Sequence, residues 1–347
     1  MSVIDKATEI LKSRDVKAEV VDEMILEVAK FQSQNNKSYG FFLETVGEDP
    51  ESWEKWSDVR PMPVRLYKEF EVSSFDGGAE KVWHSSGTTS DKVSKTYLKS
   101  TEQYDEAIRL GASWLEENTS YDKSMKHCSL IPSAEQWENS SLAYMFSRIS
   151  SPKREYDCSF ISDVTNDSFS LDIDTIRRSK GSTMFLYGTS YAFVTLFDVL
   201  KEQGIEELLD ENSVICDTGG YKNKSRTLTR REFVDEATSL LGIPEQNCVT
   251  EYGMSELSSQ FWATGTQPYT PISTIRTRVI NPRTGEDDED GVLAVYDLAN
   301  VWSCAGIMTE DVVVKVDNSP TSPLYVLGRA EGAVAKGCSL VAERALS

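Results

Sequence analysis

The sequence has few histidines and no closely spaced cysteines. Only His84 and His127 are present, and no two cysteines have the C-x-x-C spacing. A zinc site needs clustered histidine and cysteine ligands, so this pattern disfavours one. In a chain of this size we expect at least five of the six cysteines to be small buried hydrophobic residues. The six are Cys128, Cys158, Cys216, Cys248, Cys304 and Cys338.

The chain also lacks an excess of positive charge and any long uninterrupted apolar run. Lys plus Arg total 36 against 56 Asp plus Glu, which gives a net charge of −20. This charge repels a polyphosphate backbone, so we expect no nucleic-acid partner. The apolar run at 184–200 is broken by polar residues before the roughly 20 residues that a bilayer crossing needs. The amino terminus has no secretory signal pattern, so we expect a cytoplasmic protein without a membrane span.

Apolar spacing predicts helices at the amino terminus and an α/β pattern further along. The chain is 39% hydrophobic, which is enough for a real core. Residues 2–35 have apolar positions at three- and four-residue spacing, which predicts helices. Ser100 with Gln103, and Thr229 with Glu232, predict capping boxes at two further helix starts. Strand patterns alternate with helical patterns, which predicts a parallel sheet with crossover helices. The strand patterns lie within 183–190, 213–220 and 247–256, and the helical patterns within 190–204 and 230–242.

The pattern changes after about residue 270. Residues 273–298 alternate apolar and polar residues on both sides of an acidic turn, which predicts an antiparallel hairpin. We expect a core domain over residues 1–326, including a smaller antiparallel β subdomain over 270–326. Residues 327–347 form a separate carboxyl-terminal segment in this prediction.

The stretch VWHSSGTTSDKVSK, residues 82–95, places small and hydroxyl-bearing residues directly after an apolar run. A turn with so little side-chain bulk can direct backbone N–H groups at phosphate oxygens, and hydroxyls and a lysine add donors. The segment is a candidate phosphate loop, although serine-rich turns of purely structural role are common. Its candidate ligands are Ser85, Ser86, Gly87, Thr88, Thr89 and Lys92.

Four stretches downstream carry chemically suitable residues in a fixed order. DTGGY at 217–221 ends a strand pattern in two glycines, where a flat ring can approach the backbone. EYGMSE at 251–256 supplies an aromatic ring, a hydroxyl and a carboxylate. MTED at 308–311 supplies Asp311, and LGRAEGAVAKG at 327–337 supplies Arg329.

These motifs together resemble the adenylate-forming superfamily of acyl- and aryl-CoA ligases and peptide-synthetase adenylation domains. The resemblance covers residues 84–337 and implies an ATP- and Mg²⁺-dependent enzyme with that superfamily's large-domain fold. It implies that Ser85 to Thr89 bind phosphates and that Glu256 holds Mg²⁺. Ser90 replaces a family glycine, TED replaces Thr-Gly-Asp, and the choice between Lys92 and Lys95 as phosphate ligand stays open. The remaining implied nucleotide contacts are Gly219, Gly220, Tyr221, Tyr252, Gly253, Met254, Ser255, Asp311 and Arg329.

The final segment, KGCSLVAERALS, adds a second resemblance. Cys338 beside the Lys-Gly pair is similar to the acyl-protein synthetases of the LuxE type, and the pattern predicts that the superfamily's mobile carboxyl-terminal domain is truncated here. That resemblance implies activation of a fatty acid as its adenylate, transfer to Cys338 as a thioester, and delivery to a reductase partner. A thiolate near an acyl adenylate can attack its carbonyl and retain the activation.

Two other functions remain open from the sequence. One is an adenylating ligase of a biosynthetic cluster that joins an aryl or small acid to CoA, a carrier protein or an amine. The other is a catalytically silent nucleotide-binding scaffold, which the replacement of glycine by Ser90 favours. Acid-dependent pyrophosphate exchange separates the enzymes from the scaffold, and a requirement for Cys338 separates the two enzymes.

Overall fold

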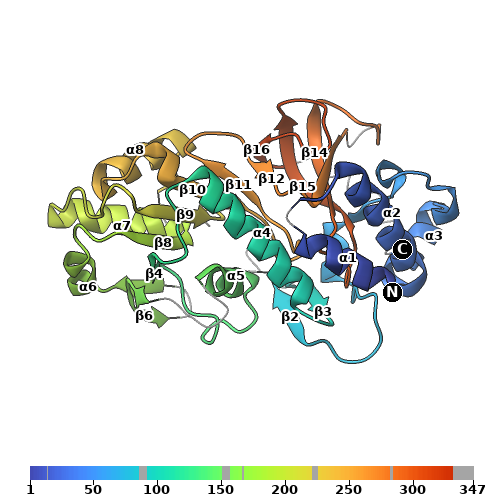
Figure 1. The fold of residues 1–347 in the computed structure, drawn as a ribbon, viewed down its shortest axis with the longest axis horizontal. Coiled ribbons are helices and arrows are strands. Elements are labelled where there is room, and N and C mark those ends of the chain that lie inside the picture. The colour runs from blue at the N-terminus through green and yellow to red at the C-terminus, as the bar shows by residue number, and fades with distance from the viewer. Residues whose placement is uncertain are drawn as a thin grey trace. The chain divides into compact units, whose positions relative to one another are not determined.

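The computed structural model describes residues 1–13, 15–85, 92–150, 157–165, 168–220, 226–281 and 284–330. The chain divides into two compact units, whose elements are labelled in Figure 1. The first unit comprises Met1–Leu110, Met254–Gln260 and Tyr269–Ser347. The second comprises Gly111–Gly253 and Phe261–Pro268.

The second unit is built on a mainly parallel sheet with the strand order β11-β10-β9-β8-β4-β5. Only the pairing of β10 with β11 is antiparallel in this series. Its strands are β4 Lys126–Ser129, β5 Cys158–Ser159, β8 Met184–Thr189, β9 Val214–Thr218, β10 Cys248–Tyr252 and β11 Phe261–Thr264. The crossover helices are α7 Ser190–Gln203 and α8 Arg230–Leu241. The predicted alternation of strands and helices is therefore confirmed.

Helices cover both faces of this sheet. On one face, Phe197 of α7 packs against Phe233 of α8 with ring centroids 5.2 Å apart, and both belong to the core cluster under these helices. On the other face, Phe146 stacks on Tyr187 with centroids 4.3 Å apart. The remaining elements are α4 Glu102–Asn118, which begins in the first unit, α5 Ser141–Ser150, α6 Ile173–Arg178, a 3₁₀ turn Glu245–Asn247, and the hairpin of β6 Ile161–Thr165 and β7 Ser168–Leu171.

The first unit contains the predicted antiparallel region. Its main sheet has the order β1-β15-β14-β13, and β16 pairs with β15. The strands are β1 Met62–Pro63, β13 Ile275–Ile280, β14 Asp290–Asp297, β15 Gly306–Lys315 and β16 Leu324–Arg329. The short strand β12 spans Thr270–Pro271, and β2 Lys81–His84 pairs with β3 Lys95–Leu98 as a separate hairpin. The antiparallel prediction after residue 270 is confirmed by the pairing of β13 with β14.

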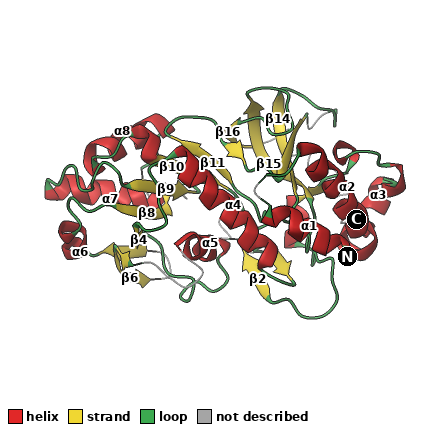
Figure 2. Ribbon diagram, in the orientation of Figure 1, coloured by secondary structure: helices red, strands yellow, loops and turns green. Residues whose placement is uncertain are grey.

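The amino-terminal helices α1, α2 and α3, drawn in red in Figure 2, belong to the first unit. They are α1 Val3–Lys12, α2 Ala18–Asn35 and α3 Lys37–Val46, followed by 3₁₀ turns at Pro50–Ser52, Trp56–Asp58 and Val64–Lys68. The buried Gln32 amide of α2 donates to the Asn300 carbonyl at 2.8 Å and accepts from the Ala305 N–H at 2.8 Å. These bonds satisfy backbone groups of the segment between β14 and β15. The bounds of α1 and α2 confirm the helices predicted within residues 2–35.

One of the two predicted capping boxes is wrong. Thr229 and Glu232 form theirs at the start of α8. At α4, Ser100 Oγ accepts from the Glu102 N–H, but the side chain of Gln103 bonds Thr8 and Trp302 instead of turning back to Ser100. Long-range partners from α1 and the β14–β15 segment therefore replace the local contact.

The expectation for the cysteines is also wrong in part. Cys128 and Cys158 are directly opposite each other on β4 and β5 and form a disulfide. Pairing across neighbouring parallel strands cannot be read from the separation of 30 residues. Cys216, Cys248 and Cys304 are free and buried, as expected. Within the described ranges, no helix combines the length and the apolar character that a bilayer crossing requires.

Candidate active site

The second unit places several predicted residues at one edge of its sheet. Gly219 and Gly220 directly follow β9, and Tyr252 is the last residue of the adjacent parallel strand β10. The carboxyl ends of neighbouring parallel strands meet at the same edge. Ligands of open α/β sheets bind at this edge. Gly219, Gly220 and Tyr252 therefore lie at the same edge of the sheet.

The glycine pair leaves room beside the backbone. Gly219 has a φ of +74°, a left-handed conformation that favours glycine. Among the described residues, a Cβ added at Gly219 or at Gly220 would meet no heavy atom within 4 Å. The described residues therefore leave this part of the backbone open to a flat ring. Tyr221, the third predicted residue of this motif, lies outside the described residues.

A buried polar network holds the turn at Gly219. Arg230 at the start of α8 donates to Asp217 of β9, with Nη1 2.6 Å from Oδ1. The Ser190 hydroxyl lies 2.7 Å from Asp217 Oδ2 and 2.8 Å from the Gly219 carbonyl oxygen. Arg230 also donates to the carbonyls of Gly265 and Cys248. The network fixes the first glycine relative to β9 and to the starts of both crossover helices.

A second buried carboxylate lies beside Tyr252. The Tyr252 ring meets Phe261 of β11 edge to face, with centroids 5.5 Å apart. Its neighbour Glu251 is 6% exposed and accepts from the Thr218 hydroxyl. Burial raises the pKa of the Glu251 carboxyl to about 7, while the Thr218 bond opposes that shift and the charge of Asp217 adds to it.

The same carboxylate explains the glycine that follows Tyr252. A Cβ at Gly253 would lie only 2.3 Å from Glu251 Oε1. Glycine is therefore the only residue that fits this turn without a shift of the buried carboxylate. Gly253 is the last residue of the second unit before the chain enters the first unit at Met254.

In the first unit, two serines are paired beside the β2–β3 hairpin. The Ser85 N–H donates to the Ser94 carbonyl at 3.1 Å, and the Ser94 N–H donates to Ser85 Oγ at 3.0 Å. Lys92 is exposed and forms an ion pair with Glu69. Lys95 begins β3 and is exposed. The placement of Lys92 and Lys95 leaves the choice of phosphate lysine between them open.

Glu256 is a buried carboxylate held by hydroxyl groups. It is 6% exposed, its Oε1 accepts from the Ser94 hydroxyl, and its Oε2 lies 2.9 Å from Ser255 Oγ. Its backbone carbonyl accepts from the Asn300 side-chain amide at 2.9 Å. Among the described residues, no lysine or arginine forms an ion pair with Glu256. A buried carboxylate without a cationic side chain is a suitable ligand for a divalent cation.

The turn after Glu256 is anchored by a carboxylate from β14. Asp297 is fully buried, and its Oδ2 accepts from the N–H groups of Ser258 at 2.9 Å and Ser259 at 2.7 Å. Its Oδ1 accepts from the Ser259 hydroxyl at 2.6 Å and from the Ala299 N–H at 2.9 Å. Burial raises the pKa of Asp297, and these four bonds oppose that rise. Asp297 therefore fixes the backbone that carries Glu256.

Asp311 and Arg329 are brought together across β15 and β16. They are directly opposite each other in the strand register, with Arg329 Nε 3.7 Å from Asp311 Oδ1. Arg329 also lies 3.5 Å from Glu310 and is 64% exposed, whereas the Asp311 side chain is 12% exposed. A carboxylate and a guanidinium in this arrangement supply an acceptor and donors for a vicinal diol.

Some predicted residues lie outside the described part of the chain, and some important ones were not predicted. Outside the described residues are Ser86, Gly87, Thr88, Thr89, Tyr221 and Cys338. The polar groups that hold the site residues but were not singled out are Ser94, Ser190, Asp217, Arg230, Asp297 and Asn300. Ser94 and Asp217 lie within the quoted motifs, so the sequence could have singled them out. The sequence does not show which residues they form hydrogen bonds with.

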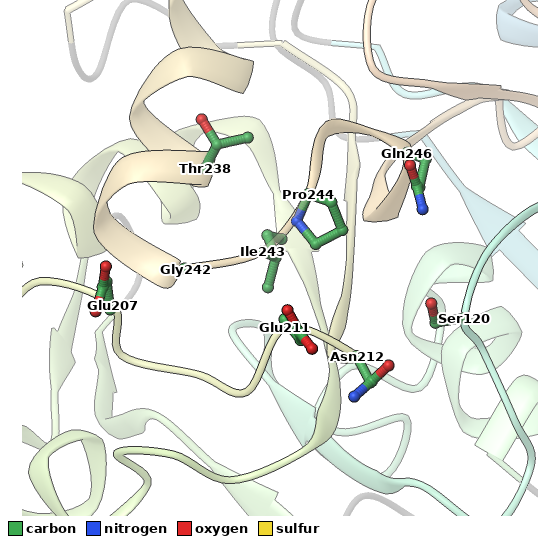
Figure 3. Close-up of a pocket in the computed structure, with 9 residues that line it drawn as sticks. All are labelled: Ser120, Glu207, Glu211, Asn212, Thr238, Gly242, Ile243, Pro244 and Gln246. Carbon is green, nitrogen blue, oxygen red and sulfur yellow. The ribbon is translucent and has the colours of Figure 1, made fainter.

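A surface cavity of about 550 Å³ lies elsewhere in the second unit (Figure 3). Its lining includes Glu211 and Asn212 before β9 and Pro244 and Gln246 before β10. These positions lie at the amino ends of the strands, the edge opposite to Gly219 and Tyr252. The cavity is therefore separate from the predicted nucleotide contacts.

Comparisons with known proteins identify the family and the fold. The sequence profile of the family described as "Acyl-protein synthetase, LuxE" matches residues 2–347. An open conformation of 2-hydroxyisobutyryl-CoA ligase with 2-HIB-AMP and CoA has a similar structure, with a TM-score of 0.65 and 14% identity over 90% of this chain and 71% of that chain. The same ligase in its postadenylation state gives a TM-score of 0.64, 14% identity and coverage of 92% and 70%. The chain thus has the predicted fold of the adenylate-forming ligases. A search of curated protein sequences finds no match.

Proposed function

Because the chain belongs to the LuxE acyl-protein synthetase family, we propose that it is an ATP-dependent acyl-protein synthetase acting on a fatty acid. In the first step, a carboxylate oxygen attacks the α-phosphorus of ATP, the bond to pyrophosphate breaks, and an acyl adenylate forms. In the second step, a thiolate attacks the acyl carbonyl, the bond to AMP breaks, and a thioester remains.

The single observation that carries this proposal is the buried Glu256 carboxylate. It lies in the motif that resembles the metal-binding motif of adenylate-forming enzymes, and its side chain has hydroxyl partners but no cationic partner among the described residues. Mg²⁺ is commonly held by one or two carboxylates together with substrate phosphates, so this donor set fits that ion. When bound, Mg²⁺ would neutralise phosphate charge as pyrophosphate leaves.

The remaining roles are assigned by position. Gly219, Gly220 and Tyr252 would receive the adenine ring, because the glycines leave open space and tyrosine offers a flat face. Asp311 and Arg329 would bind the ribose hydroxyls. Lys92 or Lys95 would contact phosphate, together with Ser85.

The acceptor assignment rests on the sequence and the family. Cys338 would receive the acyl group, and a reductase or a carrier protein would then take it. An internal thiol has a high effective concentration and needs no second thiol substrate. The buried Cys304 is a poor nucleophile by contrast, because burial raises the pKa of its thiol to about 12.

Incubation with ATP, Mg²⁺ and a radiolabelled fatty acid tests both steps. We expect the chain to become labelled through a hydroxylamine-sensitive bond. Cys338→Ser should lose the label but keep acid-dependent pyrophosphate exchange, and Cys304→Ala should keep both. Unchanged labelling of Cys338→Ser would refute the acceptor assignment, while exchange with only small or aryl acids would favour the biosynthetic ligase.

A further inference from the structure

Glu256 is oriented by a residue that the motif itself does not contain. Oε1 accepts from the hydroxyl of Ser94, which is 162 residues earlier in the chain. Ser94 is fully buried, and both residues belong to the first unit. A buried hydroxyl that bonds a buried carboxylate restricts the rotation of that side chain.

The backbone of Ser94 is fixed by two hydrogen bonds with Ser85. Its backbone N–H donates to Ser85 Oγ at 3.0 Å, and its carbonyl accepts from the Ser85 N–H at 3.1 Å. Ser94 immediately precedes β3, so the hairpin restrains it further. On the other side of the bond, Asn300 and Asp297 hold the backbone of Glu256 and of the following turn.

We propose that Ser94 is a positioning residue that presents the Glu256 carboxylate to Mg²⁺ in its complex with ATP. The inference rests on the proposed function, since it takes Glu256 as the metal ligand. The Ser94 bond to Oε1 and the Ser255 bond to Oε2 hold the carboxylate plane before the ion arrives. Outer residues that orient a metal ligand commonly change metal affinity or activity by 10- to 100-fold when they are removed.

The chain offers a matched control in β3, the strand that directly follows Ser94. Thr96 is two residues beyond Ser94, is 2% exposed, and its hydroxyl has no hydrogen-bond partner in the described structure. Thr96→Val therefore removes a buried hydroxyl close to Ser94 without removing a bond to Glu256. Ser94→Thr keeps the hydroxyl and should restore what Ser94→Ala loses.

The test is the binding of ATP by calorimetry, with Mg²⁺ and with EDTA. For the unaltered chain and for Thr96→Val, we expect Mg²⁺ to tighten ATP binding. In Ser94→Ala, the factor by which Mg²⁺ tightens ATP binding should fall by about tenfold or more. The affinity of this variant for ATP in EDTA and its thermal midpoint should stay unchanged. An equal gain in Ser94→Ala and the unaltered chain would overturn the inference while leaving the proposed function intact. Failure of the unaltered chain to bind ATP under either condition would reject the proposed function, and the inference with it.

Discussion

Arg230 and Asp217 form an ion pair that joins the first turn of α8 to the carboxyl end of β9, with Nη1 2.6 Å from Oδ1. The Asp217 side chain is 4% exposed and that of Arg230 is 26% exposed. The pair belongs to the network that includes the Ser190 hydroxyl and the Gly219 carbonyl. A mostly buried ion pair therefore supports the turn that would receive adenine.

Removal of one partner of this pair should destabilise the protein. Arg230→Met leaves the Asp217 carboxylate without its counter-charge, and the expected loss in free energy of unfolding is about 3 kcal/mol. Urea unfolding measures this loss. The neighbouring Arg231 pairs with Glu245 on the surface, so Arg231→Met should have a much smaller effect. Equal losses for both variants would contradict the structural role of the Asp217 pair.

The two adjacent glycines should respond differently to alanine. Gly219→Ala places a side chain at a φ of +74°, which should cost about 1–2 kcal/mol in stability. Gly220 is not in that conformation, and no atom of the described residues would contact an added Cβ there, so Gly220→Ala should keep its thermal midpoint. Its added methyl should nevertheless weaken ATP binding if adenine lies there. Unchanged ATP affinity in a folded Gly220→Ala protein would argue against this adenine site.

Glu251 should make stability depend on pH. Its pKa is about 7 in the folded protein against an ordinary value of 4.5, so the folded state binds the extra proton between these values. Stability contributed by Glu251 is therefore present below about pH 4.5 and is lost as the pH rises to about 7, with a slope of at most roughly 1.4 kcal/mol per pH unit.

Glu251→Gln removes this titration and keeps a group that can bond Thr218. Urea unfolding of both proteins from pH 5 to pH 8 should show that the variant gains stability relative to the unaltered chain as the pH rises, with a plateau above about pH 7. A constant difference across this range would rule out the titration of Glu251.

The Cys128–Cys158 disulfide should be detectable by alkylation. Two more cysteines should react after reduction of the unfolded chain than before it, and mass spectrometry of peptides should assign them to Cys128 and Cys158. The bond closes a loop with a sequence separation of 30, for which chain entropy gives a stabilisation of roughly 3–4 kcal/mol. The Cys128→Ala variant should lose this increment under oxidising conditions only. Equal alkylation before and after reduction would contradict the disulfide.

The local patterns predicted the strands and helices that carry the motifs, because apolar periodicity and turn residues determine them. Thus Tyr252 ends the strand β10 and Gly219 follows the parallel strand β9, as expected. The supporting contacts were not predicted, since they join residues far apart in the sequence. Ser94 is 162 residues from Glu256, and no local spacing relates the two. The misassigned Gln103 shows the same effect, because distant partners replaced its local capping bond.

Acid-dependent exchange of labelled pyrophosphate into ATP tests adenylate formation most directly. With Mg²⁺ and a series of fatty acids, we expect exchange that requires the acid and falls by at least about tenfold in a folded Glu256→Gln variant. No exchange with any fatty, small or aryl acid, or full exchange in Glu256→Gln, would contradict ATP-dependent acid activation through this carboxylate.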